Sequence, residues 1–155
     1  MNIKSISNHI AFDSIFETHK DKESGKILWQ DIVKSQDLPT EFIDTYFHQL
    51  KQFKLERFQD LNEFLIKKYS HFLNWYTFVK FRKIPTNILY QNIQIIRKLK
   101  LFGLLLRYQN LDYNFIIDFF NELKGIKNFE ILIKSQLTNF TDKQKQKILN
   151  QLLFQ

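Results

Sequence analysis

An internal repeat is the feature that most constrains how this 155-residue chain can fold. A basic residue, then serine or an aromatic residue, then glutamine or arginine, recurs five times along the chain. The third residues of these tripeptides, here called the reference positions, are 23, 23, 27 and 27 residues apart. Apolar residues recur six, seven and fourteen positions after the reference position, and such offsets share one face of a helix. The tripeptides are Lys34-Ser35-Gln36, Arg57-Phe58-Gln59, Lys80-Phe81-Arg82, Arg107-Tyr108-Gln109 and Lys134-Ser135-Gln136.

The offsets predict that each repeat is a short first helix, a turn and a longer second helix. Pro39 and Pro85 lie three positions after a reference position, where Asn62 and Asp112 stand in other repeats. Proline at the first helical position, or Asn or Asp as N-cap, is typical of a helix start. Short helices are marginal alone and need neighbours, so we expect an all-α, solenoid-like stack of about nine to eleven helices. The first helices open at aromatic residues expected in the core: Trp29, Phe53, Trp75, Phe102 and Phe129.

The repeat also divides the chain. Residues 1–26 fit no repeat and form an N-terminal segment or cap, in which residues 7–19 could be a helix or a strand and residues 21–26 a turn. The helical-repeat domain covers residues 27–155, with units near 27–51, 52–74, 75–100, 101–127 and 128–155. The last unit has a polar helix that begins after Thr141, as expected of a repeat that closes a stack.

The pattern Trp29-x2-Ile32-x3-Gln36-x-Leu38-x3-Phe42-Ile43-x2-Tyr46 resembles short repeats found in many proteins of giant DNA viruses and some phages. Those repeats carry a W-x2-I-S-x2-Q-x-L-S-x2-F-I phrase, and Val33 replaces its first serine here. The resemblance covers residues 29–140 and weakens at Arg82 and beyond Gln136. It implies helical repeats and a viral or mobile-element source, and it implies no activity.

Composition excludes several kinds of chemistry. The chain has no cysteine, and its three glycines are too far apart for a glycine-rich phosphate loop. The four histidines lack metal-ligand spacing, and no nucleophile, base and acid can be read from the sequence. We therefore expect no enzyme activity, no cofactor and no metal. The first residues lack the pattern of a signal peptide, and no apolar run reaches membrane-spanning length. We therefore expect no signal peptide and a cytoplasmic protein, in an infected host cell if the source is viral.

Net charge is +7 and uneven: −3 over residues 1–50, +8 over 51–100 and +2 over 101–155. One cation per repeat opens each tripeptide, which is expected for helix C-terminal ends but also forms a candidate basic edge. The two longer repeats add residues 97–100 and 124–127, predicted to be basic contact loops or one-turn helix extensions. The candidate binding residues are Lys34, Arg57, Lys80, Arg82, Lys83, Arg97, Lys98, Lys100, Arg107, Lys124, Lys127 and Lys134.

The glutamine at the reference position is expected to staple the turn between the two helices, or alternatively to contact a partner. Two functions remain. The favoured one is a protein-binding repeat module for a partner with an acidic surface, such as a viral inhibitor of a host defence machine, acting as a monomer or weak oligomer. The alternative is a nucleic-acid-binding protein. Against it stand only four arginines, and aromatic residues that fall on core positions rather than between the lysines.

Overall fold

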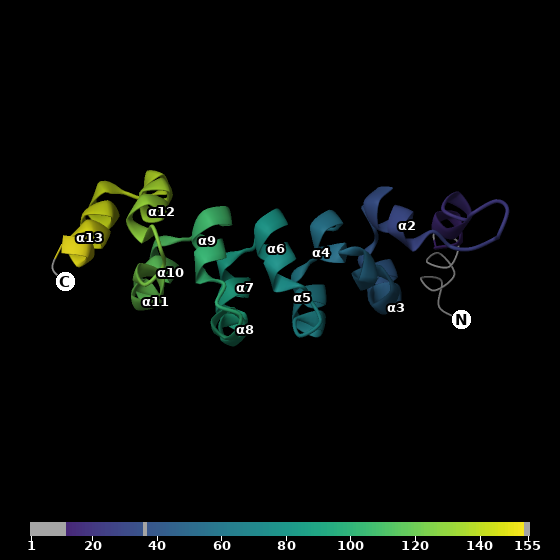
Figure 1. Cartoon of the computed structure of the whole chain (residues 1–155), viewed down its shortest axis with the longest axis horizontal. Helices are drawn as coiled ribbons and strands as arrows, with labels where there is room; N and C mark the ends of the chain where they lie inside the picture. The colour runs from purple at the N-terminus through teal and green to yellow at the C-terminus, as the bar shows by residue number, and fades with distance from the viewer. Residues whose placement is uncertain (1–11, 36, 154–155) are drawn as a thin grey trace. The chain divides into compact units, whose positions relative to one another are not determined.

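The computed structural model describes residues 12–35 and 37–153, which form helices and the turns between them (Figure 1). Within these residues there is no strand, only an isolated bridge between Lys20 and Ile27, so the predicted all-α class is confirmed. The chain divides into two compact units, unit 1 (Met1–Phe78) and unit 2 (Val79–Gln155).

Unit 1 begins, among the described residues, with a helix over residues 12–18. The unit continues with α2 (Trp29–Ser35), α3 (Thr40–Leu50), the short 3-10 helix η1 (Lys51–Phe53), α4 (Leu55–Phe58) and α5 (Glu63–Tyr69). Helix α6 (Trp75–Phe81) starts in unit 1 and ends in unit 2. In unit 1, α2 contacts both α3 and α4.

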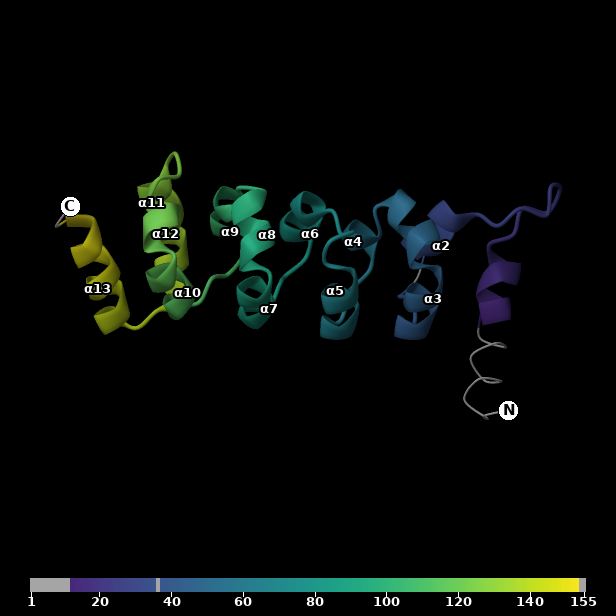
Figure 2. The ribbon, with the colours of Figure 1, turned by 90° about the horizontal axis from the view of Figure 1, so that it is seen from below.

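Unit 2 continues with α7 (Thr86–Gln91), α8 (Ile93–Lys98), α9 (Phe102–Tyr108), α10 (Tyr113–Asp118) and α11 (Phe120–Lys124). It ends with α12 (Phe129–Gln136), the 3-10 helix η2 (Leu137–Asn139) and α13 (Asp142–Leu153). Helix α9 contacts both α11 and α12 (Figure 2).

The segment before the repeats is helical where the structure describes it. The rings of Phe12 and Phe16 lie 5.0 and 5.5 Å from the ring of Phe42 in α3, and Phe16 also meets Trp29 at 5.7 Å. The open choice between helix and strand is therefore settled as helix for residues 12–18, while residues 7–11 lie outside the described residues. The predicted turn over residues 21–26 is present, and Gly25 has the left-handed φ of 67° that glycine adopts without strain.

The predicted core positions are buried in both units. At offsets six and seven, Phe42 and Ile43 are at most 1% exposed, and the equivalent pairs are buried in every repeat that has them. The residues at offset fourteen are also buried, three of them on the inward face of a second helix and Leu73 in the turn after α5. The other members of these sets are Leu65-Ile66, Ile88-Leu89 and Phe115-Ile116 at offsets six and seven, and Leu50, Leu73, Ile96 and Leu123 at fourteen.

The prediction of one continuous second helix is wrong at offset ten. Tyr46 (φ −112°, ψ 22°), Asn92 (−111°, 19°) and Phe119 (−112°, 22°) share nearly the same non-helical conformation. The bend kinks α3 and separates α7 from α8 and α10 from α11, so the described residues hold thirteen α-helices rather than nine to eleven. Because three different residue types bend alike, the repeated packing of the helices, rather than one residue's propensity, produces the bend.

The second helices begin near the predicted residues, whereas the first helix predicted from Phe53 begins at Leu55, with Phe53 in η1. The side chains of Asn62 and Asp112 accept hydrogen bonds from the N–H groups of Leu65 and Phe115, at 3.0 and 2.7 Å. Pro39 and Pro85 were predicted to be the first residues of their helices. Each is instead the N-cap, so the helix begins one residue later than predicted.

Two further predictions concern the start of the last helix and the burial of the aromatic residues near the start of the first helices. Thr141 and Gln144 exchange backbone–side-chain bonds at 3.0 and 3.4 Å, which is the capping box of a helix start. Trp75 is 2% exposed, as predicted for a core residue, whereas Trp29 and Phe53 are only half-buried.

Candidate functional site

Buried glutamines hold the helix ends of neighbouring repeats together. In unit 1, Gln59 accepts a hydrogen bond from the N–H of Leu38 (2.8 Å) and donates to the carbonyl of Val33 (2.7 Å). These two backbone groups flank the turn between α2 and α3, so the glutamine of one repeat satisfies the turn of the repeat before it. The predicted role in turn stapling is confirmed, but the stapled turn belongs to the preceding repeat rather than to the glutamine's own. Gln36 lies outside the described residues.

Unit 2 repeats this arrangement twice. Gln109 accepts from the N–H of Ile84 (2.8 Å) and donates to the carbonyl of Arg82 (2.7 Å) and to that of Val79. Gln136 accepts from the N–H of Leu111 (3.0 Å) and donates to the carbonyls of Leu106 and Gln109, at 3.0 and 2.7 Å. Both glutamines are about 5% exposed or less. These bonds bring the C-terminal end of α6 next to that of α9, and the end of α9 next to that of α12.

The cation edge is the set of basic residues in the last turns of the first helices. All five are exposed, and each lies where its charge also favours the helix dipole. In unit 2 the glutamine bonds place three of them on consecutive helix ends. The edge residues are Lys34 and Arg57 in unit 1, and Lys80, Arg107 and Lys134 in unit 2.

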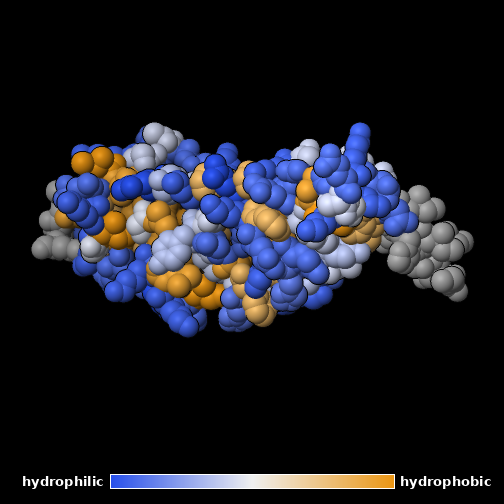
Figure 3. Space-filling view, turned by 45° about the vertical axis from the view of Figure 1, so that its right-hand side comes forward, coloured by the Kyte–Doolittle hydropathy of each residue, from blue (hydrophilic) through white to orange (hydrophobic). Residues whose placement is uncertain are grey.

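Exposed aromatic rings lie beside these cations, which corrects the expectation that aromatic residues are confined to the core. Phe81 and Tyr108, each directly after an edge cation, are 43% and 40% exposed. Lys80 Nζ lies 5.4 Å from the centre of the Phe81 ring, within cation–π range. The signal was present in the sequence, because the middle tripeptide position is serine in two repeats and aromatic in three, and a core position would not be serine. On the face drawn in Figure 3, hydrophobic residues form patches separated by hydrophilic ones.

The remaining candidate residues are placed differently. Lys83 is exposed in the loop after α6, whereas Arg82 is half-buried and its carbonyl accepts from Gln109. Arg97 and Lys98 form the last turn of α8, and Lys124 ends α11, so each added segment is partly helix extension and partly turn. The exposed members are Arg97, Lys98, Lys100, Lys124 and Lys127.

The apolar residues of the added segments are partly covered by the protein itself. Leu99 and Ile126 are half-buried, and the Ile126 methyl group is 3.5 Å from where a side chain would begin on Gly103 of α9. Arg97 also faces its own unit, because its guanidinium is 2.8 Å from Glu122 and lies over the Phe119 ring. This arginine holds the pKa of Glu122 below its ordinary value.

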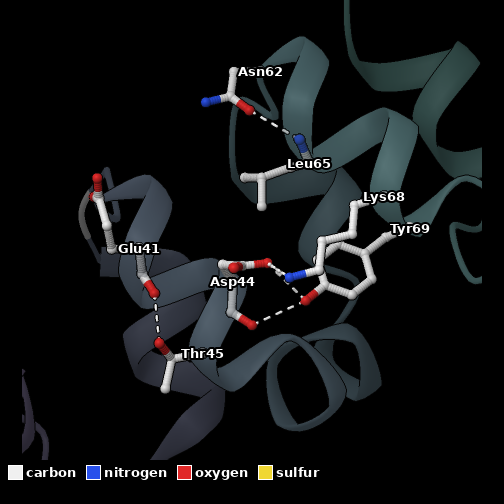
Figure 4. Close-up of polar contacts among 7 residues, drawn as sticks. All are labelled: Glu41, Asp44, Thr45, Asn62, Leu65, Lys68 and Tyr69. Atoms are coloured by element: carbon white, nitrogen blue, oxygen red, sulfur yellow. Dashed lines mark hydrogen bonds and ion pairs between the residues drawn. The ribbon is translucent and has the colours of Figure 1, made fainter.

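A polar cluster in unit 1 joins α3 to α5 (Figure 4). Lys68 Nζ donates to Asp44 Oδ1 at 2.6 Å, and the Tyr69 hydroxyl donates to the same oxygen at 2.8 Å. The lysine, and then the tyrosine, hold the pKa of Asp44 below its ordinary value, against the partial burial that raises it. Burial raises the pKa of Tyr69, whose ring stacks on Phe47 with 3.7 Å between ring centres. The cluster is a structural link between two second helices, and the sequence did not reveal it.

One pair of residues has the geometry of a nucleophile and its base. Ser35 Oγ lies 2.6 Å from His19 Nε2, and His19 Nδ1 lies 2.9 Å from the carbonyl of Ile15. The bond links the segment directly after the helix over residues 12–18 to the end of α2.

Comparison of the chain with family models, with curated proteins and with solved structures gives no match. Within residues 12–35 and 37–153, no group of three or more metal-ligating side chains could hold a metal ion. Among the same residues, no helix combines the length and the hydropathy needed to cross a membrane.

Proposed function

We propose that this chain is a solenoid-like stack of helix-turn-helix repeats that binds another protein, through an acidic surface of that protein, and catalyses no reaction itself. Three recurring features support the stack: the buried glutamine bonds, the shared bend at offset ten and the buried positions at offsets six, seven and fourteen. In repeat proteins each unit buries its apolar face against its neighbours and leaves edges free for binding.

The observation that carries the binding proposal is the cation edge of unit 2. Lys80, Arg107 and Lys134 are exposed at the C-terminal ends of α6, α9 and α12, the first helices of three successive repeats. Hydrogen bonds from Gln109 and Gln136 link these helix ends. Residues 79–155 hold 13 basic and 5 acidic side chains, so an acidic partner surface would be attracted to this unit from a distance. Lys83 adds a further exposed charge in the loop after α6.

The test is affinity capture with the tagged chain from cells of its native host, with and without nuclease, followed by binding of the purified partner. The variant Lys80→Glu/Arg107→Glu/Lys134→Glu should keep the helical circular dichroism spectrum, because exposed charges contribute little to folding. It should lose most of its affinity for the partner, because the reversed charges repel an acidic surface. Reversing Arg97 is a poorer test, since it would also break the bond to Glu122. A folded triple variant that binds the purified partner as tightly as the unmodified chain would contradict the proposal.

A nucleic-acid partner is the second candidate, and the exposed rings of Phe81 and Tyr108 beside Lys80 and Arg107 favour it. Aromatic rings among cations are what single-stranded nucleic acid stacks upon. Capture that disappears after nuclease treatment, and an affinity that falls linearly with the logarithm of salt concentration, would favour this candidate. Loss of oligonucleotide binding in Tyr108→Ala, but not in the exposed control Tyr76→Ala, would assign the stacking.

The resemblance of residues 29–46 to repeats of giant viruses and phages supports a narrower form of the proposal. The partner would then be part of a host defence machine, such as a nuclease, which the chain inhibits in the cytoplasm of the infected cell. Capture from infected and uninfected cells of the same host tests this, and a partner of purely viral origin would contradict it.

A further inference from the structure

A cavity in unit 1 gathers cations and aromatic rings in one place. Its volume is about 300 Å³, at the lower end of the range for small-ligand sites. It lies where α2, η1 and α4 meet, and these three elements contact one another. Its lining residues are Gln30, Lys34, Gln52, Phe53, Lys54, Arg57 and Phe58.

The lining is positively charged although unit 1 as a whole is not. Three of the lining residues are cations and none is acidic, whereas residues 1–78 hold 10 basic and 11 acidic side chains. Lys34 Nζ and Arg57 Cζ lie 5.9 and 5.4 Å from the centre of the same ring, that of Phe58. The lining of the cavity therefore presents three positively charged side chains and no acidic one to a ligand, which favours an anion.

Lys54 contributes a second observation. Its φ of 60° is left-handed, a conformation that costs a lysine more than a glycine or asparagine. Lys54, one of the three cations that line the cavity, therefore has an unfavourable backbone conformation. Lys100 and Asn128 have the same left-handed φ in the turns before later first helices, so the conformation belongs to the repeat, and in this repeat it places Lys54 in the cavity lining.

We propose that this cavity binds a small phosphomonoester that carries a planar ring. Lys34, Lys54 and Arg57 would surround the phosphate, whose charge and several oxygens suit one guanidinium and two ammonium groups better than a carboxylate would. The ring would pack against Phe53 and Phe58, since a free phosphate ion fills only a small part of the cavity. The proposal goes beyond the partner-binding function. The cavity shares Lys34 and Arg57 with the cation edge, whereas Lys54 lies outside that edge, so a Lys54 variant tests the cavity separately.

The experiment is a titration of the full chain with phenyl phosphate, followed by calorimetry or by NMR shifts. Inorganic phosphate and benzyl alcohol serve as probes of the two halves of the ligand. We expect saturable binding of phenyl phosphate, weaker binding of inorganic phosphate and none of benzyl alcohol. The absence of saturable phenyl phosphate binding at millimolar concentration overturns the proposal, and equal affinity for inorganic phosphate overturns the assignment of the ring.

Matched variants locate the site. Lys54→Gln should weaken phenyl phosphate binding about tenfold, the usual effect of losing one charge-assisted hydrogen bond. Gln30→Glu, which places a negative charge in the cavity, should weaken it at least as much. Lys67→Gln removes an exposed lysine from the last turn of α5, outside the cavity, and should leave the affinity unchanged. Equal losses in Lys54→Gln and Lys67→Gln would overturn the site, and Lys134→Glu, which impairs the cation edge, should not change phenyl phosphate binding.

Discussion

Residues 1–78 and residues 79–155 use the same internal bonds but carry very different charge. The first unit has 10 basic and 11 acidic side chains, and the second has 13 and 5. Gln59 in unit 1 and Gln109 in unit 2 nevertheless bind the turn of the preceding repeat in the same way. Each accepts from an N–H and donates to a carbonyl at corresponding positions of that repeat. The buried hydrogen-bond framework is therefore shared, while the charge of the remaining side chains differs between the two units.

The largest expected effect tests whether the two units depend equally on their buried aromatic residues. Trp75→Ala in unit 1 and Phe102→Ala in unit 2 should each lower the free energy of unfolding by about 3–5 kcal/mol, because both rings are at least nine-tenths buried. The half-buried Trp29 should cost clearly less when changed to alanine. Urea unfolding followed by circular dichroism measures all three. Equal losses for Trp29→Ala and Trp75→Ala would contradict the difference in burial.

The next effect concerns the glutamine bonds. Gln59→Ala and Gln109→Ala should each lower the free energy of unfolding by about 2–3 kcal/mol, because buried N–H and carbonyl groups lose their partners. The exposed glutamines Gln49 in α3 and Gln94 in α8 provide matched alanine controls, which should change stability by less than about 0.5 kcal/mol. If one staple mutation is as mild as its control, the two units do not share a framework.

A smaller effect distinguishes the polar links of the two units by pH. The folded pKa values of Asp44 and Glu122 are both lowered, so each bond stabilises the fold above the ordinary carboxyl pKa of about 4 and is lost as pH falls through the lower folded value. Asp44→Asn should therefore reduce stability at pH 7 and leave it unchanged near pH 2. Because both pairs are partly exposed, the loss at pH 7 should be about 1 kcal/mol or less.

Asp44 is bound by the side chains of two residues, Lys68 and Tyr69, whereas both side-chain bonds to Glu122 described above come from Arg97 alone. Asp44→Asn should consequently flatten the acid dependence of stability more than Glu122→Gln does. Urea midpoints measured from pH 7 to pH 2 compare the two variants. A larger flattening of the acid dependence in Glu122→Gln than in Asp44→Asn would contradict this prediction.

The smallest expected effect is a gain in stability. Lys54 in unit 1 and Lys100 in unit 2 both have left-handed φ angles, 60° and 54°, which glycine adopts at no steric cost. Lys54→Gly and Lys100→Gly should each raise the free energy of unfolding by about 0.5 kcal/mol. Asn128→Gly should gain less, because asparagine tolerates this conformation better than lysine. A loss of stability in both lysine variants would show that their side chains contribute more than the strain costs.

The candidate site was only partly predictable. The cation edge follows from one sequence position in each repeat, and the structure places all five of its residues on exposed last turns. The bond between Arg97 and Glu122 joins residues 25 positions apart, and the bond between Lys68 and Asp44 joins residues 24 apart. Neither pair occupies matching positions in every repeat, so no regularity of the sequence pointed to them.

The sequence by itself determined the helical class, the helix starts at Asn62 and Asp112, and the core positions, because helical periodicity and capping depend on residues within a few positions of one another. Only the tertiary structure decided that Gln59 binds the turn before its own, that the second helices bend at offset ten, and that Lys34, Lys54 and Arg57 surround one cavity. The physical reason is distance: these features depend on how helices from neighbouring repeats pack, and a side chain reaches whichever backbone group that packing brings within hydrogen-bond range.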